Sequence, residues 1–150
     1  MTTITRDNFT AAMRQAVAER GTDWRYPQYG EPGWKKYRNE TGNPVYSTAD
    51  GEPACLIGYA LHLIAPELMP GHDRRNDSYV ILGELGVTDD LLLTAARLAQ
   101  SAQDFGHSWG AALRDYGADL GFSPQELDSW IAEAEREHAK LQLRQNGGWL

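Results

Sequence analysis

Apolar residues recur at helical spacing over much of this chain. Between residues 6 and 20, the positions i, i+3, i+4, i+7 and i+8 are all apolar: Phe9, Ala12, Met13, Ala16 and Val17. Thr5 is a suitable N-cap for the segment, and Gly21 follows its last residue as a C′ glycine. The pattern therefore predicts a first helix over residues 6–20, with one side facing a core.

Five further helices are predicted after residue 52. We expect them over residues 53–65, 76–85, 88–105, from about 108, and 123–144. Pro53 suits the first position of a helix because its missing N–H would be unpaired there. Thr88 is the expected N-cap of the fourth of these six helices. The last helix has the clearest start, because Ser123 and Glu126 form a capping box around a proline.

Residues 24–48, which we call the aromatic-basic segment, differ from the rest of the chain. Prolines and glycines are frequent there and exclude a long helix. Residues 34–38 and 43–48 are candidate strands of a small hairpin, with a turn at 39–42. The predicted fold is thus mainly α, at most α+β: a compact bundle of about six helices with a small β-hairpin or extended insertion near residues 24–48.

The length and composition fit one domain over residues 1–150. The chain has 150 residues, of which 41% are apolar and 23% charged. No secretory signal is recognisable, and the longest apolar stretch, residues 55–65, is too short to cross a bilayer. A single cysteine allows no internal disulfide, which fits a reducing compartment. We therefore expect a cytoplasmic protein with a mobile tail at residues 145–150.

The charge is distributed unevenly. The chain carries a net charge of −7, whereas the aromatic-basic segment has four basic side chains against two acidic ones. An acidic body repels a phosphate backbone, so nucleic-acid binding through the body is disfavoured. The segment is the best candidate for a contact surface, since tyrosine, tryptophan and arginine are frequent in binding hot spots. The candidate residues are Arg25, Tyr29, Trp34, Lys35, Lys36, Tyr37 and Arg38.

The same composition has other interpretations. The aromatic residues of the segment can simply cover the helical core while its lysines face solvent. They can also stack on the bases of a single-stranded nucleic acid. We favour a protein partner over a nucleic acid and expect no contact with a membrane.

Cys55 is the candidate for nucleophilic chemistry. It lies near the start of an apolar helix, where the helix dipole lowers the pKa of a thiol. His62 is two turns away on the same helix, so only His72 or His107 could approach the sulfur through tertiary folding. Cysteine is also among the most frequently buried residue types. The favoured interpretation is a buried Cys55 and no catalytic site.

No metal or cofactor site is predicted. His62, His72, Asp73, His107 and Cys55 lack the short paired spacings of zinc ligands. Residues 113–131 have the outline of a helix-turn-helix, but the exposed start of their second helix is acidic and would repel phosphates. We interpret that turn as a structural corner.

Two stretches carry a resemblance to a group of proteins. They are Pro53-Ala-Cys-Leu-Ile-Gly-Tyr-Ala-Leu61 and Ala99-Gln-Ser-Ala-Gln-Asp-Phe-Gly-His-Ser-Trp109. The chain resembles, over residues 24–120, small uncharacterised proteins of actinobacteria and their phages. In that group a tyrosine- and glycine-rich stretch precedes a Cys-x-x-Gly helix, and an Asn/Asp-x-x-Gly-x-Thr/Ser turn opens a later helix.

Cys55 and Gly58 match the first of these motifs. Asp104, Gly106 and Ser108 match the second only in part, because one residue rather than two separates the aspartate from the glycine. The resemblance implies a fold and a habitat, and it carries no catalytic role.

The sequence thus predicts a non-catalytic accessory or regulatory protein that binds another protein. A phage-encoded protein acting on a host component fits the size, the acidity and the resemblance. The alternatives are a hydrolase or transferase that depends on Cys55, with His107 or His72, and a nucleic-acid-binding protein that uses residues 24–48.

Overall fold

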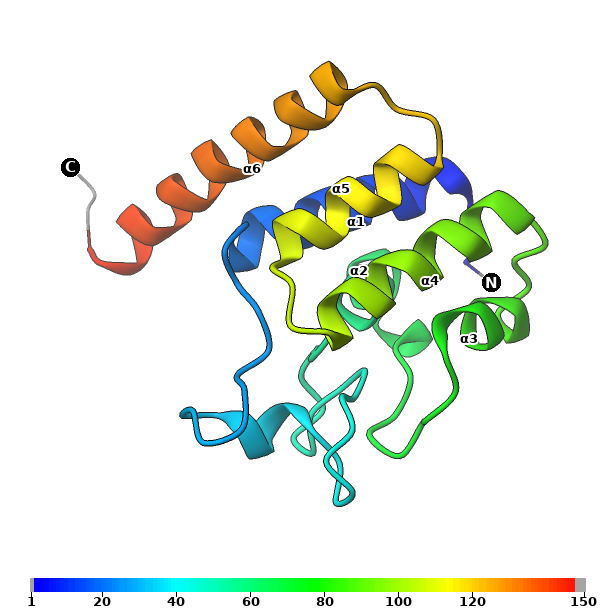
Figure 1. Cartoon of the computed structure of the whole chain (residues 1–150), viewed down its shortest axis with the longest axis vertical. Coiled ribbons are helices and arrows are strands. Elements are labelled where there is room, and N and C mark those ends of the chain that lie inside the picture. The colour runs from blue at the N-terminus through cyan, green and yellow to red at the C-terminus, as the bar shows by residue number, and fades with distance from the viewer. Residues whose placement is uncertain (1, 148–150) are drawn as a thin grey trace.

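The computed structural model describes residues 2–147 and is mainly helical, as predicted (Figure 1). Its elements are α1 (Arg6–Arg20), η1 (Trp34–Tyr37), α2 (Leu56–Ile64), η2 (Pro66–Leu68), α3 (Ser78–Glu84), α4 (Asp90–Asp104), α5 (Trp109–Asp119) and α6 (Pro124–Gln145). The elements η1 and η2 are short 3-10 helices. Within the described range there is no helix with the length and apolar character needed to cross a membrane.

Helix α1 lies at the centre of the bundle. It contacts α2, α5 and α6, while α4 packs between α3 and α5 (Figure 1). The apolar stripe predicted for α1 is buried, and the Phe9 ring lies 6.1 Å from that of Tyr116 on α5. The start of α5 is fixed to the chain after α1, because the amides of Trp109 and Gly110 donate to the carbonyls of Trp24 and Thr22.

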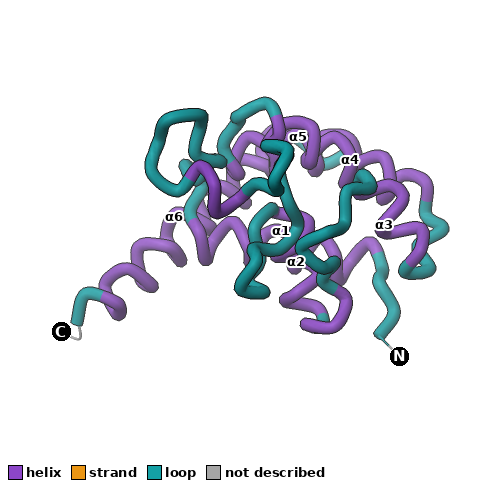
Figure 2. Tube along the Cα trace, turned by 90° about the horizontal axis from the view of Figure 1, so that it is seen from below, coloured by secondary structure: helices purple, strands orange, loops and turns teal. Residues whose placement is uncertain are grey.

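Helix α6 packs on the body from Leu127 to His138. The predicted capping box of Ser123 and Glu126 is present, and Leu127, Trp130 and Ala134 are buried. Nδ1 of His138 lies 3.1 Å and 3.2 Å from the carbonyl oxygens of Ala18 and Glu19, in the last turn of α1. Beyond this contact the helix extends away from the body (Figure 2), so its outer turns are exposed along most of their surface.

The predicted hairpin is not formed. Residues 34–37 make one turn of 3-10 helix rather than a strand, and Gly33 enters this turn in the left-handed region with φ of 85°. Strand-like pairing in the described chain is limited to isolated bridges, Arg38 with Pro44 and Ser47 with Pro53. Pro44 cannot donate to a ladder, and aromatic packing on the helical body holds the segment in place. The segment is an extended insertion.

Several predicted helix boundaries are also wrong by one to three residues. Helix α2 begins after Cys55, because Pro53 is used in the bridge to Ser47. The N-cap of α4 is Asp89 rather than the neighbouring Thr88. Gln145, which was expected in the tail, is the last residue of α6, and residues 148–150 of the predicted tail lie outside the described residues.

Candidate functional site

Trp24 fixes the aromatic-basic segment to the helical body. Its ring makes edge contacts with Trp109 of α5 at 4.9 Å, with Tyr26 at 5.6 Å and with Tyr37 at 5.3 Å between centroids. Tyr26 is fully buried and Tyr37 is partly buried. Tyr37, one of the predicted contact residues, therefore packs largely against the protein.

Arg20 anchors the same region from the end of α1. Its guanidinium carbon lies 4.6 Å from the ring centroids of both Trp24 and Trp109. The same group donates hydrogen bonds of 2.9 Å to the carbonyl oxygens of Ala54 and Pro53. Since cation–π contacts and charged hydrogen bonds both strengthen when water is excluded, this side chain ties α1 to the chain before α2. A basic residue at a helix end is the only local signal for this role.

Arg38 holds the segment together internally. Its Nη2 atom donates to the carbonyl oxygen of Pro27 at 3.0 Å, and its guanidinium lies over the rings of Trp34 and Tyr26 at 5.5 Å and 5.7 Å. Arg38 was also predicted as a contact residue. The structure gives it a bracing role, which fixes the backbone on which Trp34 and Tyr29 are presented.

The remaining candidates form what we call the outer face: Arg25, Tyr29, Trp34, Lys35 and Lys36. Tyr29 is 86% exposed and meets Trp34 edge to face at 5.2 Å. Two of the basic groups are paired with carboxylates, because Arg25 binds Glu31 at 3.0 Å and Lys36 binds Glu52 at 3.4 Å. This pairing reduces the positive field that a phosphate backbone would meet.

Phe105 is a strongly exposed aromatic residue that the sequence pattern did not single out. Gly106, at the corner between α4 and α5, lies beside the side chain of Gln28. Its neighbour Phe105 is 84% exposed, as strongly as Tyr29 on the other side of this contact. Only tertiary folding brings the backbone at Gly106 against Gln28, so no local pattern could have identified Phe105.

The Cys55 thiol acts as a helix cap. Its sulfur accepts a hydrogen bond of 3.2 Å from the backbone N–H of Gly58, and the residue is only 3% exposed. Burial raises the pKa of the thiol to about 12. A cysteine nucleophile needs the opposite, an accessible sulfur with a lowered pKa.

The candidate histidine partners are used elsewhere or lie at the surface. Nδ1 of His72 is 2.8 Å from the carbonyl oxygen of Ser47. His107 is exposed at the α4–α5 corner, where its backbone N–H donates to Ala102. The arrangement therefore provides no activated thiol. In addition, residues 2–147 contain no group of three or more histidine, cysteine, aspartate or glutamate side chains placed to hold a metal ion.

Two glutamines of α4 cap the helices that start near it. Oε1 of Gln103 accepts from the N–H of Leu56 at 3.0 Å, and Oε1 of Gln100 accepts from the N–H of Ser78 at 2.7 Å. Gln100 also donates to the hydroxyl of Tyr46, which in turn donates to the carbonyl oxygen of Asn76 at 2.6 Å. Both glutamines belong to residues 99–109, the second of the two stretches that carry the resemblance. Their contacts make that stretch a structural brace for α2 and α3.

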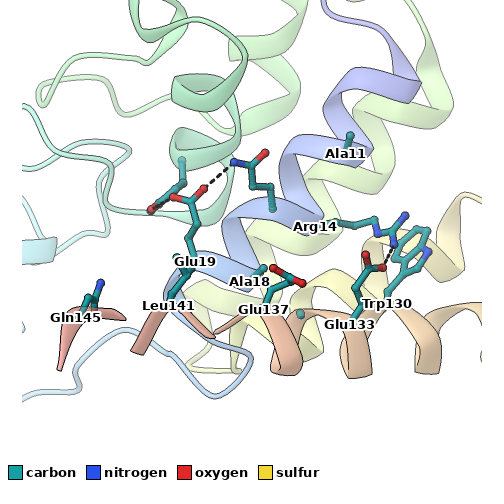
Figure 3. Close-up of a pocket in the computed structure, with 12 residues that line it drawn as sticks. Ala11, Arg14, Ala18, Glu19, Trp130, Glu133, Glu137, Leu141 and Gln145 are labelled. Carbon is teal, nitrogen blue, oxygen red and sulfur yellow. Dashed lines mark hydrogen bonds and ion pairs between the residues drawn. The ribbon is translucent and has the colours of Figure 1, made fainter. Parts of the chain in front are cut away.

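A second surface feature lies on the opposite side of α1 from α5. A groove of about 620 Å³ runs between α1 and α6, with Trp130 near one end and Gln145 near the other (Figure 3), and Tyr59 of α2 also lines it. Its walls include Glu19 from α1 and Glu137 and Leu141 from α6. This groove was not predicted, since it depends on how far α6 extends beyond the body.

Comparison with known proteins gives no further guide. No protein-family model, curated protein or solved structure matches this chain.

Proposed function

We propose that this protein is a non-catalytic accessory or regulatory protein that binds another protein through the outer face of its aromatic-basic segment. The observation that carries the proposal is the Tyr29–Trp34 pair, in which a strongly exposed ring stands on a second ring. Large aromatic side chains with a polar tip are the residues on which binding hot spots are most often built. Phe105 supplies a further strongly exposed ring, and the glycine that follows it, Gly106, lies beside the side chain of Gln28, the residue before Tyr29.

The base of this surface is already ordered by its own contacts. Arg38 bridges Pro27 and Trp34, and Trp24 fixes the segment to α5. A partner therefore meets a pre-organised backbone and has to immobilise few side chains. Pre-organisation of this kind reduces the entropic cost of association.

The alternative functions receive less support from the geometry. A nucleic acid would find Arg25 and Lys36 already paired with carboxylates. A substrate could not reach the buried sulfur of Cys55 without a change in the structure. A phage-encoded protein that acts on a host component is compatible with such a surface and remains part of the proposal.

The test is a quantitative capture experiment with matched variants. The tagged protein is incubated with a lysate of the organism that encodes it, and the captured partner is then purified and its affinity measured. Tyr29→Ala combined with Phe105→Ala is expected to weaken binding at least tenfold, as for loss of hot-spot side chains. Leu91→Ala removes an exposed apolar side chain at the other end of α4 and serves as the control.

Equal affinity of the wild type and the Tyr29→Ala, Phe105→Ala variant would refute the proposed surface. A single-stranded oligonucleotide provides the other comparison. Binding of that oligonucleotide at moderate affinity, with a steep decrease as salt is added, would favour the nucleic-acid alternative instead.

A further inference from the structure

The groove between α1 and α6 has the size and lining of a binding site. Its volume of about 620 Å³ falls within the range of ligand pockets. Small residues of both helices, Ala18 and Ala134 among them, leave the space open, and Trp130 and Leu141 supply apolar surface. The outer turns of α6 form one wall (Figure 3).

The charged groups of the groove are mainly carboxylates. Glu19, Glu133 and Glu137 line it, against a single cation, Arg14. Glu19 accepts hydrogen bonds of 2.8 Å from two neutral donors, the Tyr59 hydroxyl and the Gln15 amide. Among the described residues, no cation forms an ion pair with this carboxylate. Glu133 pairs with Arg14, and Glu137 pairs with Lys140 at 3.2 Å. Glu19 is therefore the groove carboxylate whose charge the described residues leave without an ion pair.

The end of the groove that holds Arg14 shows which chemical groups the groove can bind. Arg14 lies 4.9 Å from the ring centroid of Trp130, and its Nη2 atom is 2.7 Å from a carboxylate oxygen of Glu133. A guanidinium thus rests on an aromatic ring beside a carboxylate. The chain repeats this arrangement around Tyr59, whose hydroxyl donates to Glu19 and whose ring centroid lies 5.0 Å from the guanidinium carbon of Arg20.

We propose that this groove binds a cationic peptide segment of a partner protein. Arginine or lysine side chains of the segment pair with Glu19 and compete with the exposed Lys140 for Glu137, and an apolar side chain packs on Leu141. Charge complementarity selects this occupant, because aromatic rings and carboxylates at close range favour guanidinium groups. The site is separate from the outer face, so it does not depend on the function proposed above.

A second copy of the chain is a poorer occupant. The chain has a net charge of −7, and α6 itself carries five acidic and three basic side chains. Two acidic grooves or two α6 helices placed together would repel one another. A head-to-tail contact between the groove and the aromatic-basic segment of another copy would produce open chains of molecules, which sedimentation would reveal.

The full chain can be tested with a defined probe. The probe is a fluorescein-labelled peptide of twelve residues with arginine and leucine at helical spacing, and its control replaces each arginine by citrulline, a neutral isostere. Fluorescence anisotropy at low salt is expected to show binding of the arginine peptide and at least tenfold weaker binding of the citrulline peptide. In ¹H–¹⁵N spectra, the shifts should be concentrated on the Trp130 indole and on the amides of Ala18 and Leu141.

Charge-neutral variants separate the groove from the overall acidity. Glu19→Gln with Glu137→Gln should weaken the arginine peptide about tenfold, at roughly threefold for each pair lost. Glu67→Gln with Glu135→Gln changes the net charge equally, but these residues do not line the groove, and the affinity should stay within about twofold. Thermal unfolding of both variants establishes that they are folded.

Three results of the peptide measurements would overturn the proposal. They are equal binding of the citrulline peptide, equal weakening by the two pairs of variants, and shifts confined to residues 24–48. An oligomer that dissociates on Glu19→Gln with Glu137→Gln would also overturn it, by assigning the groove to a second copy. The Tyr29→Ala, Phe105→Ala variant should bind the peptide as the wild type does, so failure of the function proposed for the outer face leaves this result intact.

Discussion

The Cα of Gly58 lies so close to the carbonyl oxygen of Tyr46 that a Cβ built on the glycine would overlap that oxygen. The same oxygen accepts a hydrogen bond of 2.9 Å from the N–H of Ala54. The N–H of Gly58 in turn donates to the sulfur of Cys55. The Cys-x-x-Gly sequence thus has a structural explanation, in which the cysteine caps α2 and the glycine lets the preceding segment pack against it.

Gly58→Ala should therefore destabilise the protein by about 2–3 kcal/mol, because either the helix or the Tyr46 backbone must shift. Gly83→Ala is the matched control: Gly83 also lies in a helix, but nothing lies within 4 Å of its added Cβ. The control should be neutral or stabilising by up to about 1 kcal/mol, owing to the higher helix propensity of alanine. Urea unfolding measures both, and an equal effect of the two substitutions would contradict the close contact.

Gln103→Leu removes the acceptor for the N–H of Leu56 at the start of α2. Gln103 is fully buried, so the amide is left without a partner away from water. We expect a loss of about 1–3 kcal/mol in the free energy of unfolding. Gln125→Leu, at an exposed position in the first turn of α6, should change it by less than about 0.5 kcal/mol. A Gln103→Leu protein as stable as this control would show that the cap contributes little.

Cys55 should resist thiol reagents in the native protein. Its sulfur is buried and its pKa is raised to about 12, so both access and the thiolate fraction are low at neutral pH. Ellman's reagent at pH 8 should give no native-state reaction on the minute timescale and one equivalent after addition of guanidinium chloride. Rapid labelling without denaturant would restore the cysteine-dependent alternative.

Asp104 should make stability depend on pH. Although the residue is exposed, the protein around its carboxyl group raises the pKa to about 6 by desolvation, and Arg38 opposes this rise only in part. The pKa of an aspartate in the unfolded chain is about 3.9, so the folded state binds more protons between the two pKa values. The resulting stabilisation is complete below about pH 4 and is lost as the pH rises through 6.

Asp104→Asn should accordingly be more stable than the wild type at pH 7.5 and similar to it at pH 4. Solvent screening limits the difference at pH 7.5 to less than about 1 kcal/mol. A ¹³C titration of the Asp104 carboxyl group measures the midpoint directly. A midpoint at or below pH 4 would contradict the expected desolvation.

The helices with local signals were the most predictable from sequence. Helix α1 has an apolar stripe with Thr5 and Gly21 at its ends, and α6 has a capping box. The starts of α2 and α4 were misplaced because Pro53 and Thr88 are good local candidates. Tertiary pairing of Pro53 with Ser47 and the side chain of Asp89 decided these boundaries.

The candidate surface was predictable in composition and not in arrangement. The aromatic-basic segment was identified, yet Tyr37 and Arg38 proved to brace it rather than to face outward. Phe105 and the α1–α6 groove depend on contacts between residues distant in the chain, such as Gly106 with Gln28 and His138 with the end of α1. Periodicity and spacing along one chain carry no information about such contacts.

The two glutamine caps couple the local unfolding of three helices. Gln100 and Gln103 lie one helical turn apart, and each satisfies the first amide of a different helix. If α4 detaches, α2 and α3 lose these hydrogen bonds at the same moment, so the three helices are coupled in one cooperative unit of local unfolding. The backbone amides of Leu56 and Ser78 should then exchange with solvent deuterium at closely similar rates, despite the 22 positions that separate them in the chain.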